Sequence, residues 1–455
     1  MSKATTASPK MERVENPNLA EPDFTSQHIS TLRPSPLALM RNLSFPGKKV
    51  INLLSGDVGY EPSAALKEAY VKALYTKGTN KYPPVFGIEK LREKIARYLT
   101  KTTSVKFEAQ DVVVTAGGQS ALYCTHMAIL DPGDEVVTLS PYWTPIEMHS
   151  KAFFGNLVAV PMDENFEFDP AKLEKAVNEK TKAIYVNSPH NPTGKVFSYE
   201  ELESIAKIAK KNNLLVISDE PYKSIIFEGE HISTVSLPGM EKHTLIADSF
   251  SKDFNITGWR VGYAASKNKK LISRLMTPLV QSINTVSHPA QSALAEVIEN
   301  PRDQESIRDM RTKMELLVKG LNSVEGISCV RPSGSFYIFP NVGGLKRKFP
   351  KRGIGEEAFA RLKELGITDG FYEHVKNSFS WQLVDYLANF SAEYAVIVAP
   401  GKEFGEAFDD YVRLSFASRT GEELSKFLGI LQEAFGSKIK SQARPKDLRV
   451  ENPKV

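Results

Sequence analysis

Short apolar runs alternate with amphipathic stretches along most of the chain. Five runs of four or five residues are rich in valine, leucine, isoleucine and alanine, as buried strands are, and each ends in polar or aromatic residues. These runs are 112–115, 135–139, 183–186, 214–217 and 244–247. The stretches 66–75, 88–99, 121–130 and 199–211 have the spacing of helices with one apolar face.

This alternation predicts an α/β fold. Residues 199–211 separate two of the apolar runs, so we expect parallel strands joined by helical crossovers. In an open sheet of this kind, ligands bind at the edge where the strands end. The polar groups that follow the five runs should therefore gather at one site.

The rest of the chain predicts further elements. A helical pattern runs from Ile29 to Met40, residues 261–265 should form an antiparallel strand, and a long helical stretch starts at Lys269 and continues past residue 300. A C-terminal α+β region holds the expected strands 335–339, 395–399 and 411–416 and a closing helix near Phe435. The expected division is a disordered or extended arm (1–25), the N-terminal part of a small domain (26–60), a large domain (61–300), the rest of the small domain (301–435) and a disordered tail (436–455).

Composition and charge exclude several classes of protein. The 455 residues are 41% apolar and 25% charged, which suits two globular domains, and a net charge of +4 is too small to indicate a nucleic-acid partner. Cys124 and Cys329 lie in apolar segments without metal-ligand spacing, so we expect two buried free thiols and no metal site. The sequence has neither a signal-peptide core nor an apolar run of eighteen residues, so we expect a cytoplasmic protein without a membrane partner.

The segment 249–260, S-F-S-K-D-F-N-I-T-G-W-R, follows the last of the five runs. Lys252 within it can condense with a carbonyl group if burial and a neighbouring cation lower the pKa of its amine. Ser249 and Arg260 have the hydroxyl and the forked guanidinium that bind a phosphate. A lysine after a strand is also a common solvated loop residue, so the rest of the chain must decide.

Pyridoxal phosphate has a carbonyl and a phosphate, and other strand ends offer partners for its ring. Asp219 can pair with a protonated ring nitrogen, which makes the ring an electron sink. Asn191 and Tyr222 can hydrogen-bond the phenolic oxygen. Lys252 would then hold the cofactor and, once substrate displaces it, move the proton between the substrate Cα and the cofactor.

Three further features suit the same cofactor and an amino-acid substrate. Gly117, Gly118 and Gln119 form a turn between a strand and a helix, the build of an anion site, although paired glycines also occur there for steric reasons. Trp143 follows a strand and can stack on a flat ring or pack in the core. Arg413 lies in alternation on the last strand and can hold a substrate carboxylate as a fork.

Four motifs together resemble the class I and II aminotransferases of the pyridoxal-phosphate fold type I: N-S-P-H-N-P-T-G-K (187–195), S-D-E-P-Y (218–222), S-F-S-K-D-F-N-I-T-G-W-R-V-G-Y (249–263) and Y-V-R-L-S-F (411–416). Their order and approximate spacing are kept from about residue 30 to 435, and the resemblance is to the bacterial and archaeal aspartate and aromatic aminotransferases. It implies a mostly parallel seven-stranded sheet with flanking helices and a smaller α+β domain. It also implies an enzyme that moves the amino group of an L-amino acid to a 2-oxo acid, such as 2-oxoglutarate, by a ping-pong mechanism.

The resemblance also implies residue roles. The catalytic residues would be Lys252, Asp219 and Tyr222. Pyridoxal phosphate would be bound by Tyr82, Gly117, Gly118, Gln119, Trp143, Asn191, Asp219, Tyr222, Ser249, Lys252 and Arg260. Substrate would be bound by Gly56, Trp143, Asn191 and Arg413, with Trp143 as the stacking ring and Tyr142 as a weaker rival. Tyr82 matches a tyrosine that members give to the phosphate of the neighbouring subunit, which implies a homodimer with shared active sites.

The chain departs from the family pattern in three places. Residues 55–60 read S-G-D-V-G-Y where many relatives have A-G-E-P-D-F. Relatives specific for dicarboxylates use an added cation, at positions that match Ile283 or Gln119 here, and neither residue is a cation. Residues 343–377 resemble an insertion, which contains the basic run 346–352 and which we expect to be surface decoration rather than a cover for the site.

A carbon–sulfur β-lyase with the same cofactor is the alternative reading. His190 before Asn191 resembles that group, but lyases tend to have a histidine where this chain has Tyr222. A catalytically silent member of the fold would be expected to lose Lys252 or Asp219, and both are present. The aminotransferase is therefore the leading hypothesis.

Overall fold

The computed structural model describes residue 24 and residues 26–32, 35–41, 43–299, 304–349 and 375–436. Nearly all of the expected arm, the tail after residue 436 and most of the expected insertion lie outside the described residues. The chain divides into two compact units, 1–33 and 34–455, and the domain boundaries expected from the sequence remain a prediction. In the first unit, Ser26 caps α1 (Gln27–Thr31) by accepting from the backbone amides of His28 and Ile29.

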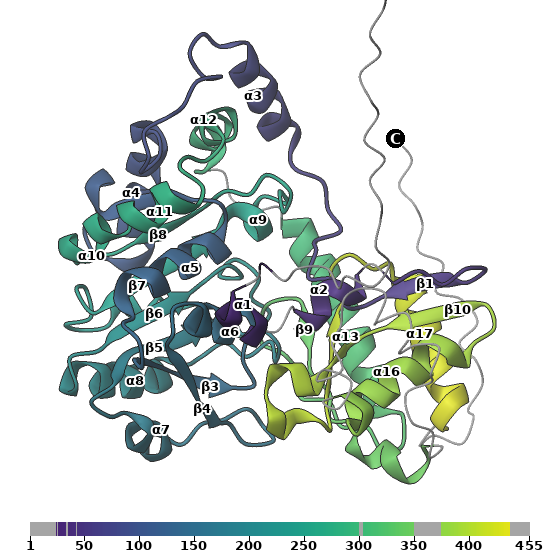
Figure 1. Ribbon diagram of the computed structural model, residues 1–455. Helices are drawn as coiled ribbons and strands as arrows, with labels where there is room; N and C mark the ends of the chain where they lie inside the picture. The colour runs from purple at the N-terminus through teal and green to yellow at the C-terminus, as the bar shows by residue number, and fades with distance from the viewer. Residues whose placement is uncertain are drawn as a thin grey trace, which may run out of the picture. The chain divides into compact units, whose positions relative to one another are not determined.

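A seven-stranded sheet dominates the second unit (Figure 1). Its strand order is β2-β8-β7-β6-β5-β3-β4, and β8 alone in this sheet runs antiparallel to its neighbours. The strands are β2 (Val112–Thr115), β3 (Glu135–Ser140), β4 (Asn156–Pro161), β5 (Thr181–Asn187), β6 (Leu215–Asp219), β7 (Thr244–Ser249) and β8 (Gly262–Ala265). The α/β fold class with a mostly parallel seven-stranded sheet is thereby confirmed.

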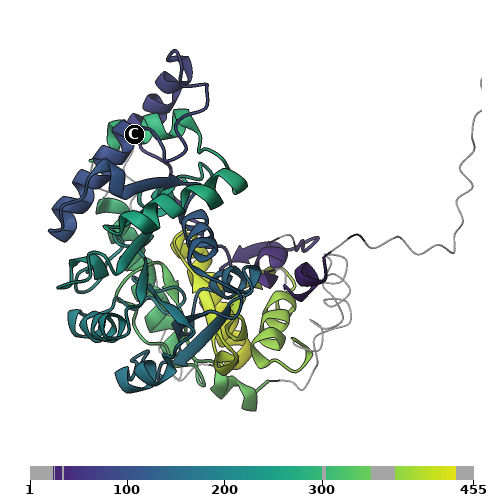
Figure 2. The same ribbon diagram turned by 60° about the vertical axis from the view of Figure 1, so that its left-hand side comes forward.

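Alternate residues of this sheet pack on different helices. In β5, Tyr185 shares a core with Leu122 of α5 (Gly118–Ile129), whereas Ile184 shares a core with Ile205 of α8 (Tyr199–Lys211). Successive side chains of a strand point to opposite faces, so helices cover both faces of the sheet, as Figures 1 and 2 show. Burial on both faces explains why the strands read as continuous apolar runs.

Several helices that flank this sheet begin at a side-chain cap. Ser198 and Glu201 form a capping box at the start of α8, in which each side chain accepts from the backbone amide of the other residue. The other helices that precede, connect or follow the seven strands are α3 (Ala64–Tyr75), α4 (Glu89–Thr103), α6 (Pro145–Ala152), α7 (Pro170–Ala176), α9 (Phe250–Asp253), α10 (Lys269–Arg274), α11 (Met276–Ser282) and α12 (His288–Val297).

Two smaller sheets form the α+β region. One pairs β1 (Lys49–Asn52) in parallel with β10 (Tyr394–Ile397), and the other has the antiparallel order β11-β12-β9. The strands of the second are β9 (Tyr337–Ile338), β11 (Ala399–Pro400) and β12 (Val412–Ser415). The accompanying helices are α2 (Pro36–Met40), α13 (Gln304–Asn322), α16 (Phe379–Phe390) and α17 (Gly421–Phe435).

Several predicted elements need correction. The helical pattern from Ile29 to Met40 corresponds to two short helices, and α2 starts anew at Pro36 after the cap Ser35. The long helix predicted from Lys269 is four helices. The break before α12 falls where Asn284 adopts a positive φ of 59° and Ser287 caps the new start. Strand β4 was not predicted, although its residues 157–160 form a continuous apolar run. The expected strand 395–399 divides into β10 and β11.

Two other expectations concern the cysteines and the membrane. Cys124 and Cys329 are both buried and free, which confirms the prediction. Burial raises the pKa of the Cys329 thiol to about 12. None of the helices in the described ranges is both long and apolar enough to cross a bilayer.

Candidate active site

A cavity of about 580 Å³ lies at the carboxyl ends of β5, β6 and β7 and extends to the α+β region. Parallel strands bring their carboxyl ends to one edge, which is where the sequence predicted a site. Of the predicted site residues, the cavity is lined by Gly56, Gly118, Gln119, Trp143, Asn191, Asp219, Tyr222, Ser249, Lys252, Arg260 and Arg413. Gly117 and Tyr82 do not line it.

Lys252 enters the cavity from α9, which starts directly after β7 with Ser249 as its cap. Its Nζ donates to the carbonyl oxygen of Gly56 at 2.5 Å and lies 5.5 Å from the ring centre of Phe336. Burial lowers the pKa of Lys252 to about 8, and the cations Arg260, Arg41 and Arg413 act in the same direction, against Asp57. A lysine of this kind has an accessible neutral amine near physiological pH, as covalent chemistry requires.

Asp219 ends β6 beside Asn187, its register partner at the end of β5. Its Oδ2 accepts from the Tyr185 hydroxyl at 2.6 Å and from Asn187 Nδ2 at 3.1 Å. Tyr185 and Asn187 are two apart on one strand and so share a face. Burial raises the pKa of Asp219 to about 7, although the Tyr185 hydrogen bond opposes the shift. Among the described residues both donors reach Oδ2, which leaves Oδ1 to face a ligand.

Arg413 on β12 is a buried cation without a carboxylate partner among the described residues. Its guanidinium donates to Asn191 Oδ1 at 3.1 Å and to the carbonyl oxygen of Leu54 at 2.7 Å, while its Nε has no hydrogen-bond partner. Burial lowers the pKa of Arg413. A buried charge that neutral oxygens alone satisfy is a ready receptor for an anion.

Tyr222 and Tyr337 form a pair on the same wall of the cavity. Their hydroxyl oxygens are 3.1 Å apart, and both rings are buried. Burial raises the pKa of each tyrosine, so both hydroxyls stay protonated and can donate. Arg413 also lies over the Tyr337 ring, 4.6 Å from its centre.

The glycine turn before α5 and Arg260 form another wall. A Cβ on Gly117 would come within 2.8 Å of the Arg260 guanidinium, and Gly117 has a φ of 80°, so a side chain would fill this space. The first amides of α5 have no partner within the helix, and the Ser249 hydroxyl lies 2.8 Å from that of Ser251. Amides at a helix start, hydroxyls and a guanidinium together suit a phosphate.

Trp143 and Gly56 also meet at the cavity, whereas Tyr82 does not reach it. Trp143 lines the cavity and packs edge-on against His149, with 5.8 Å between ring centres. A Cβ on Gly56 would overlap the Tyr337 hydroxyl, so the close approach there requires glycine. Tyr82 is 87% exposed in the single chain.

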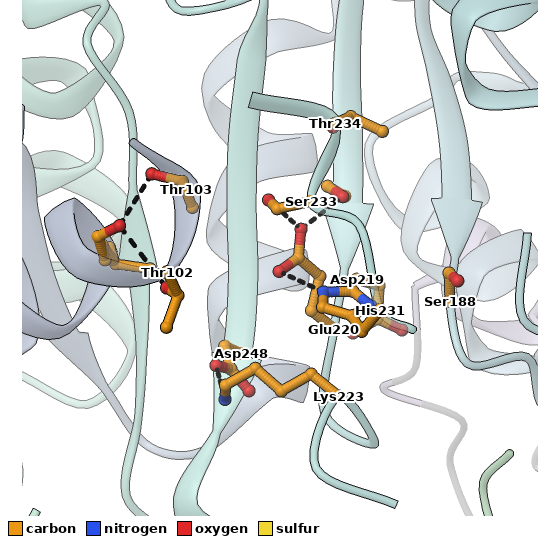
Figure 3. Close-up of polar contacts among 12 residues, drawn as sticks. Thr102, Thr103, Ser188, Asp219, Glu220, Lys223, His231, Ser233, Thr234 and Asp248 are labelled. Carbon is orange, nitrogen blue, oxygen red and sulfur yellow. Dashed lines mark hydrogen bonds and ion pairs between the residues drawn. The ribbon is translucent and has the colours of Figure 1, made fainter. Parts of the chain in front are cut away.

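A buried polar network lies directly behind Asp219 (Figure 3). The Glu220 carboxylate accepts from Ser218 and Ser233 at 2.7 and 2.6 Å and contacts His231 at 3.1 Å. Burial alone would raise the pKa of Glu220, but these partners outweigh it and lower the pKa. Because Glu220 follows Asp219 in sequence, the network fixes the chain at the end of β6.

Ion pairs of Lys223 anchor the strand that precedes Lys252. Lys223 pairs with Asp248 of β7, as Figure 3 shows, and also with Asp253 at 3.0 Å. The Tyr263 hydroxyl donates to Asp248 at 2.6 Å. The strand end that presents Lys252 is therefore held from two sides.

His190, on which the lyase alternative rested, does not line the cavity. It is buried, its Nδ1 lies 2.7 Å from the Thr193 hydroxyl, and burial lowers its pKa to about 3. A neutral histidine in this position stabilises the loop after β5 rather than meeting a substrate.

Several cavity residues were not assigned by sequence reasoning. Tyr337, Arg41 and Asp57 line the cavity, and Tyr185 and Asn187 hold Asp219. Asn187 stood inside a quoted motif, and Tyr337 stood on an expected strand, so both had a local signal. Arg41 had no such signal, because it follows a short helix and is distant in sequence from the strands whose ends form the cavity.

The residues that form the cavity thus match the functional groups of pyridoxal phosphate. It has a lysine with a lowered pKa, an aspartate oxygen open to a ring nitrogen, and a glycine turn in contact with an arginine. The donor set of helix amides, hydroxyls and guanidinium matches the phosphate.

Comparison with known proteins agrees with this fit. The family model for aminotransferase class I and II matches residues 48–431. The probable aspartate/prephenate aminotransferase of Aquifex aeolicus is 35% identical over 337 residues, which cover 71% of this chain and 84% of that protein. A solved structure of the Thermus thermophilus aspartate aminotransferase with maleate matches with a TM-score of 0.74 and 31% identity, over 90% of this chain and 99% of that one. The aromatic aminotransferase structure from Pyrococcus horikoshii matches with a TM-score of 0.72 and 29% identity, over 87% and 98%. The chain therefore belongs to the class I and II aminotransferases, a family of enzymes that transfer amino groups with pyridoxal phosphate.

Proposed function

We propose that this aminotransferase binds pyridoxal phosphate in the cavity at the strand ends and moves an amino group from an L-amino acid to a 2-oxo acid in two half-reactions. The observation that carries the proposal is that Lys252, Asp219 and Arg413 line one cavity, with Arg413 buried and without a carboxylate partner among the described residues. When bound, the cofactor would supply an electron sink for charge that develops at the substrate Cα.

Each residue has a stated task in this proposal. Lys252 would hold the cofactor and then carry the proton to and from the substrate Cα. Asp219 would keep the ring nitrogen protonated through Oδ1, with Tyr185 and Asn187 holding Oδ2. Tyr222 and Asn191 would donate to the phenolic oxygen. The phosphate would be bound by Gly117, Gly118, Gln119, Ser249 and Arg260, and Trp143 would cover the ring.

The direct test is a screen of single half-reactions. The purified protein, loaded with pyridoxal phosphate, is mixed with one amino acid at a time, and the absorbance and products are followed. We expect conversion to the pyridoxamine form with release of the matching 2-oxo acid. Persistent absorbance of the aldehyde form, with ammonia and pyruvate accumulating from a cysteine conjugate, would refute transamination and establish the β-lyase.

Arg413→Ala should weaken substrate binding for every amino acid. A charge-assisted hydrogen bond contributes about 1.5–3 kcal/mol, so we expect kcat/KM to fall by roughly 10- to 150-fold, mainly through KM. Steady-state kinetics with several donors measures this effect, and circular dichroism controls for folding. An unchanged KM would contradict the role of Arg413 as the carboxylate clamp.

We further propose a homodimer in which Tyr82 reaches the phosphate of the partner subunit. Tyr82 is 87% exposed, and α3 nearby exposes Val71, Leu74 and Tyr75, apolar surface that suits an interface. The dimer would have two shared sites.

Hybrid dimers test this arrangement. A mixture of Lys252→Ala and Tyr82→Ala chains, co-expressed with different tags, should contain one intact site per hybrid, because Lys252 and Tyr82 of one site come from different chains. We expect the purified hybrid to regain about half the activity of the unmodified dimer. Activity no higher than that of the Tyr82→Ala homodimer would refute the shared site, and a monomeric mass by sedimentation would refute the dimer.

The cytoplasmic location also remains a proposal. The two buried free cysteines support it, since neither forms a disulfide.

A further inference from the structure

Arg41 brings to the cavity a cation that the proposed function does not use. It follows α2, whose first turn is capped by Ser35 through the amide of Ala38. Met40 is buried in the core, whereas Leu37, Ala38 and Arg41 line the cavity. Residues three and four apart share a face of a helix. One side of α2 is therefore anchored by Met40, and another presents Arg41 to the cavity.

The charges that line the cavity are unbalanced. Among the residues that the structure describes, four cations line it, Lys252, Arg260, Arg413 and Arg41, against two carboxylates, Asp57 and Asp219. Both carboxylates already have partners: Asp57 accepts from the Thr257 hydroxyl at 2.8 Å and Asp219 from Tyr185 at 2.6 Å.

Arg41 itself has no hydrogen bond or ion pair within the ranges that the structure describes. It is nevertheless close enough to lower the pKa values of Lys252 and Arg413. Its guanidinium therefore adds to an excess of positive charge that ligands must neutralise.

The ligands of the proposed function account for two of these cations. Arg260 faces the glycine turn where the phosphate would bind, and Arg413 would take the substrate α-carboxylate. Both arginines line the cavity, but Arg413 is only 5% exposed, whereas Arg41 is exposed. When Arg413 holds the α-carboxylate and the amino group faces Lys252, the substrate side chain still needs a partner, and Arg41 is a lining cation that these contacts do not use.

We propose that Arg41 binds the side-chain carboxylate of an acidic substrate, so that this enzyme acts on dicarboxylic amino and oxo acids; this rests on the proposed function. The positions from which relatives take such a cation hold Gln119 and Ile283 here. Arg41 supplies the charge from a different part of the chain. A forked guanidinium suits a second carboxylate as Arg413 suits the first.

Arg41→Gln, Arg41→Lys and the control Arg347→Gln test this assignment in the loaded enzyme. Arg347 is an exposed arginine in the short turn η3 (Gly343–Arg347), outside the cavity. Half-reaction rates are measured with aspartate and glutamate and, for comparison, with alanine and phenylalanine. The affinities of maleate and of the monoacid propanoate are measured by calorimetry.

Arg41→Gln should lower kcat/KM for aspartate and glutamate and the affinity for maleate by about 10- to 100-fold. Alanine, phenylalanine and propanoate should change by less than about threefold, Arg41→Lys should fall between, and Arg347→Gln should match the unmodified enzyme. An equal loss for acidic and neutral substrates, unchanged maleate affinity, or a loss confined to pyridoxal phosphate affinity would overturn the assignment.

The calorimetric measurement separates this inference from the proposed function. If the unmodified enzyme releases ammonia and pyruvate without converting to the pyridoxamine form, the transamination proposal fails, while maleate affinity still decides the role of Arg41. If transamination is observed but maleate binds Arg41→Gln as tightly as the unmodified enzyme, only the role of Arg41 fails.

Discussion

Replacing Lys252 with alanine should abolish turnover. The amine of Lys252 is the cavity group with an accessible neutral form, because burial lowers its pKa to about 8. In the proposed mechanism, its loss removes both the covalent bond to the cofactor and the proton carrier, and general acid–base catalysis alone contributes typically about 100- to 10,000-fold. Single-turnover kinetics with aspartate should show no conversion within hours, and the protein should lose the yellow colour of the covalently held cofactor.

The matched control for this variant is Lys242→Ala. Lys242 is an exposed lysine between β6 and β7, near the amino end of β7 and so at the opposite edge of the sheet. It should retain full activity and colour. Both variants should unfold at similar temperatures, because the Lys252 amine donates to a backbone carbonyl, that of Gly56, and burial of this lysine disfavours its charged form. Turnover in Lys252→Ala near that of the unmodified enzyme would refute the assignment.

Asp219→Asn should give the second-largest loss. A charge pair at contact in a partly shielded site contributes on the order of 4 kcal/mol before desolvation is subtracted, so kcat/KM should fall by up to about 1,000-fold. Asparagine has nearly the same shape but cannot stabilise a protonated ring nitrogen. The loss should therefore appear in kcat, with substrate affinity largely kept, in pre-steady-state measurements.

Tyr185→Phe is the comparison that isolates the charge of Asp219. It removes the 2.6 Å hydrogen bond to Oδ2 but leaves the carboxylate and the Asn187 contact in place. One hydrogen bond to a charged group is worth about 1.5–3 kcal/mol, so its effect should be smaller than that of Asp219→Asn. If the two variants lose the same activity, Asp219 acts through geometry and not through its charge.

The sequence predicts the large sheet well because its strands are buried on both faces. Runs such as 183–186 are apolar without interruption, and a polar residue directly after them marks the strand end. Lys252, Asp219 and Asn191 could therefore be predicted to meet from local pattern alone. Arg413 could be placed because it alternates with apolar neighbours on β12.

Site residues whose position depends on contacts between distant parts of the sequence were harder to predict. Arg41 follows a five-residue helix, and its place at the cavity depends on how that helix packs, with Met40 buried in the core. Tyr337 was expected on a strand, but its contact with Tyr222 joins residues 115 positions apart. The helix predicted after Lys269 was too long because the pattern is helical on both sides of Asn284, where the backbone leaves the helical region.

The contact between Arg413 and Leu54 has a consequence for the order in which the enzyme is assembled during synthesis. The two residues are 359 positions apart, and β1 likewise pairs with β10 from the other end of the chain. On the ribosome, all seven strands of the large sheet, residues 112–265, emerge before these late partners exist. A nascent chain can thus form the large sheet, with its proposed cofactor-binding edge, before β10 is available to pair with β1. A chain that terminates before residue 413 would contain Lys252 and Asp219 but would lack Arg413, the residue proposed to bind the substrate carboxylate.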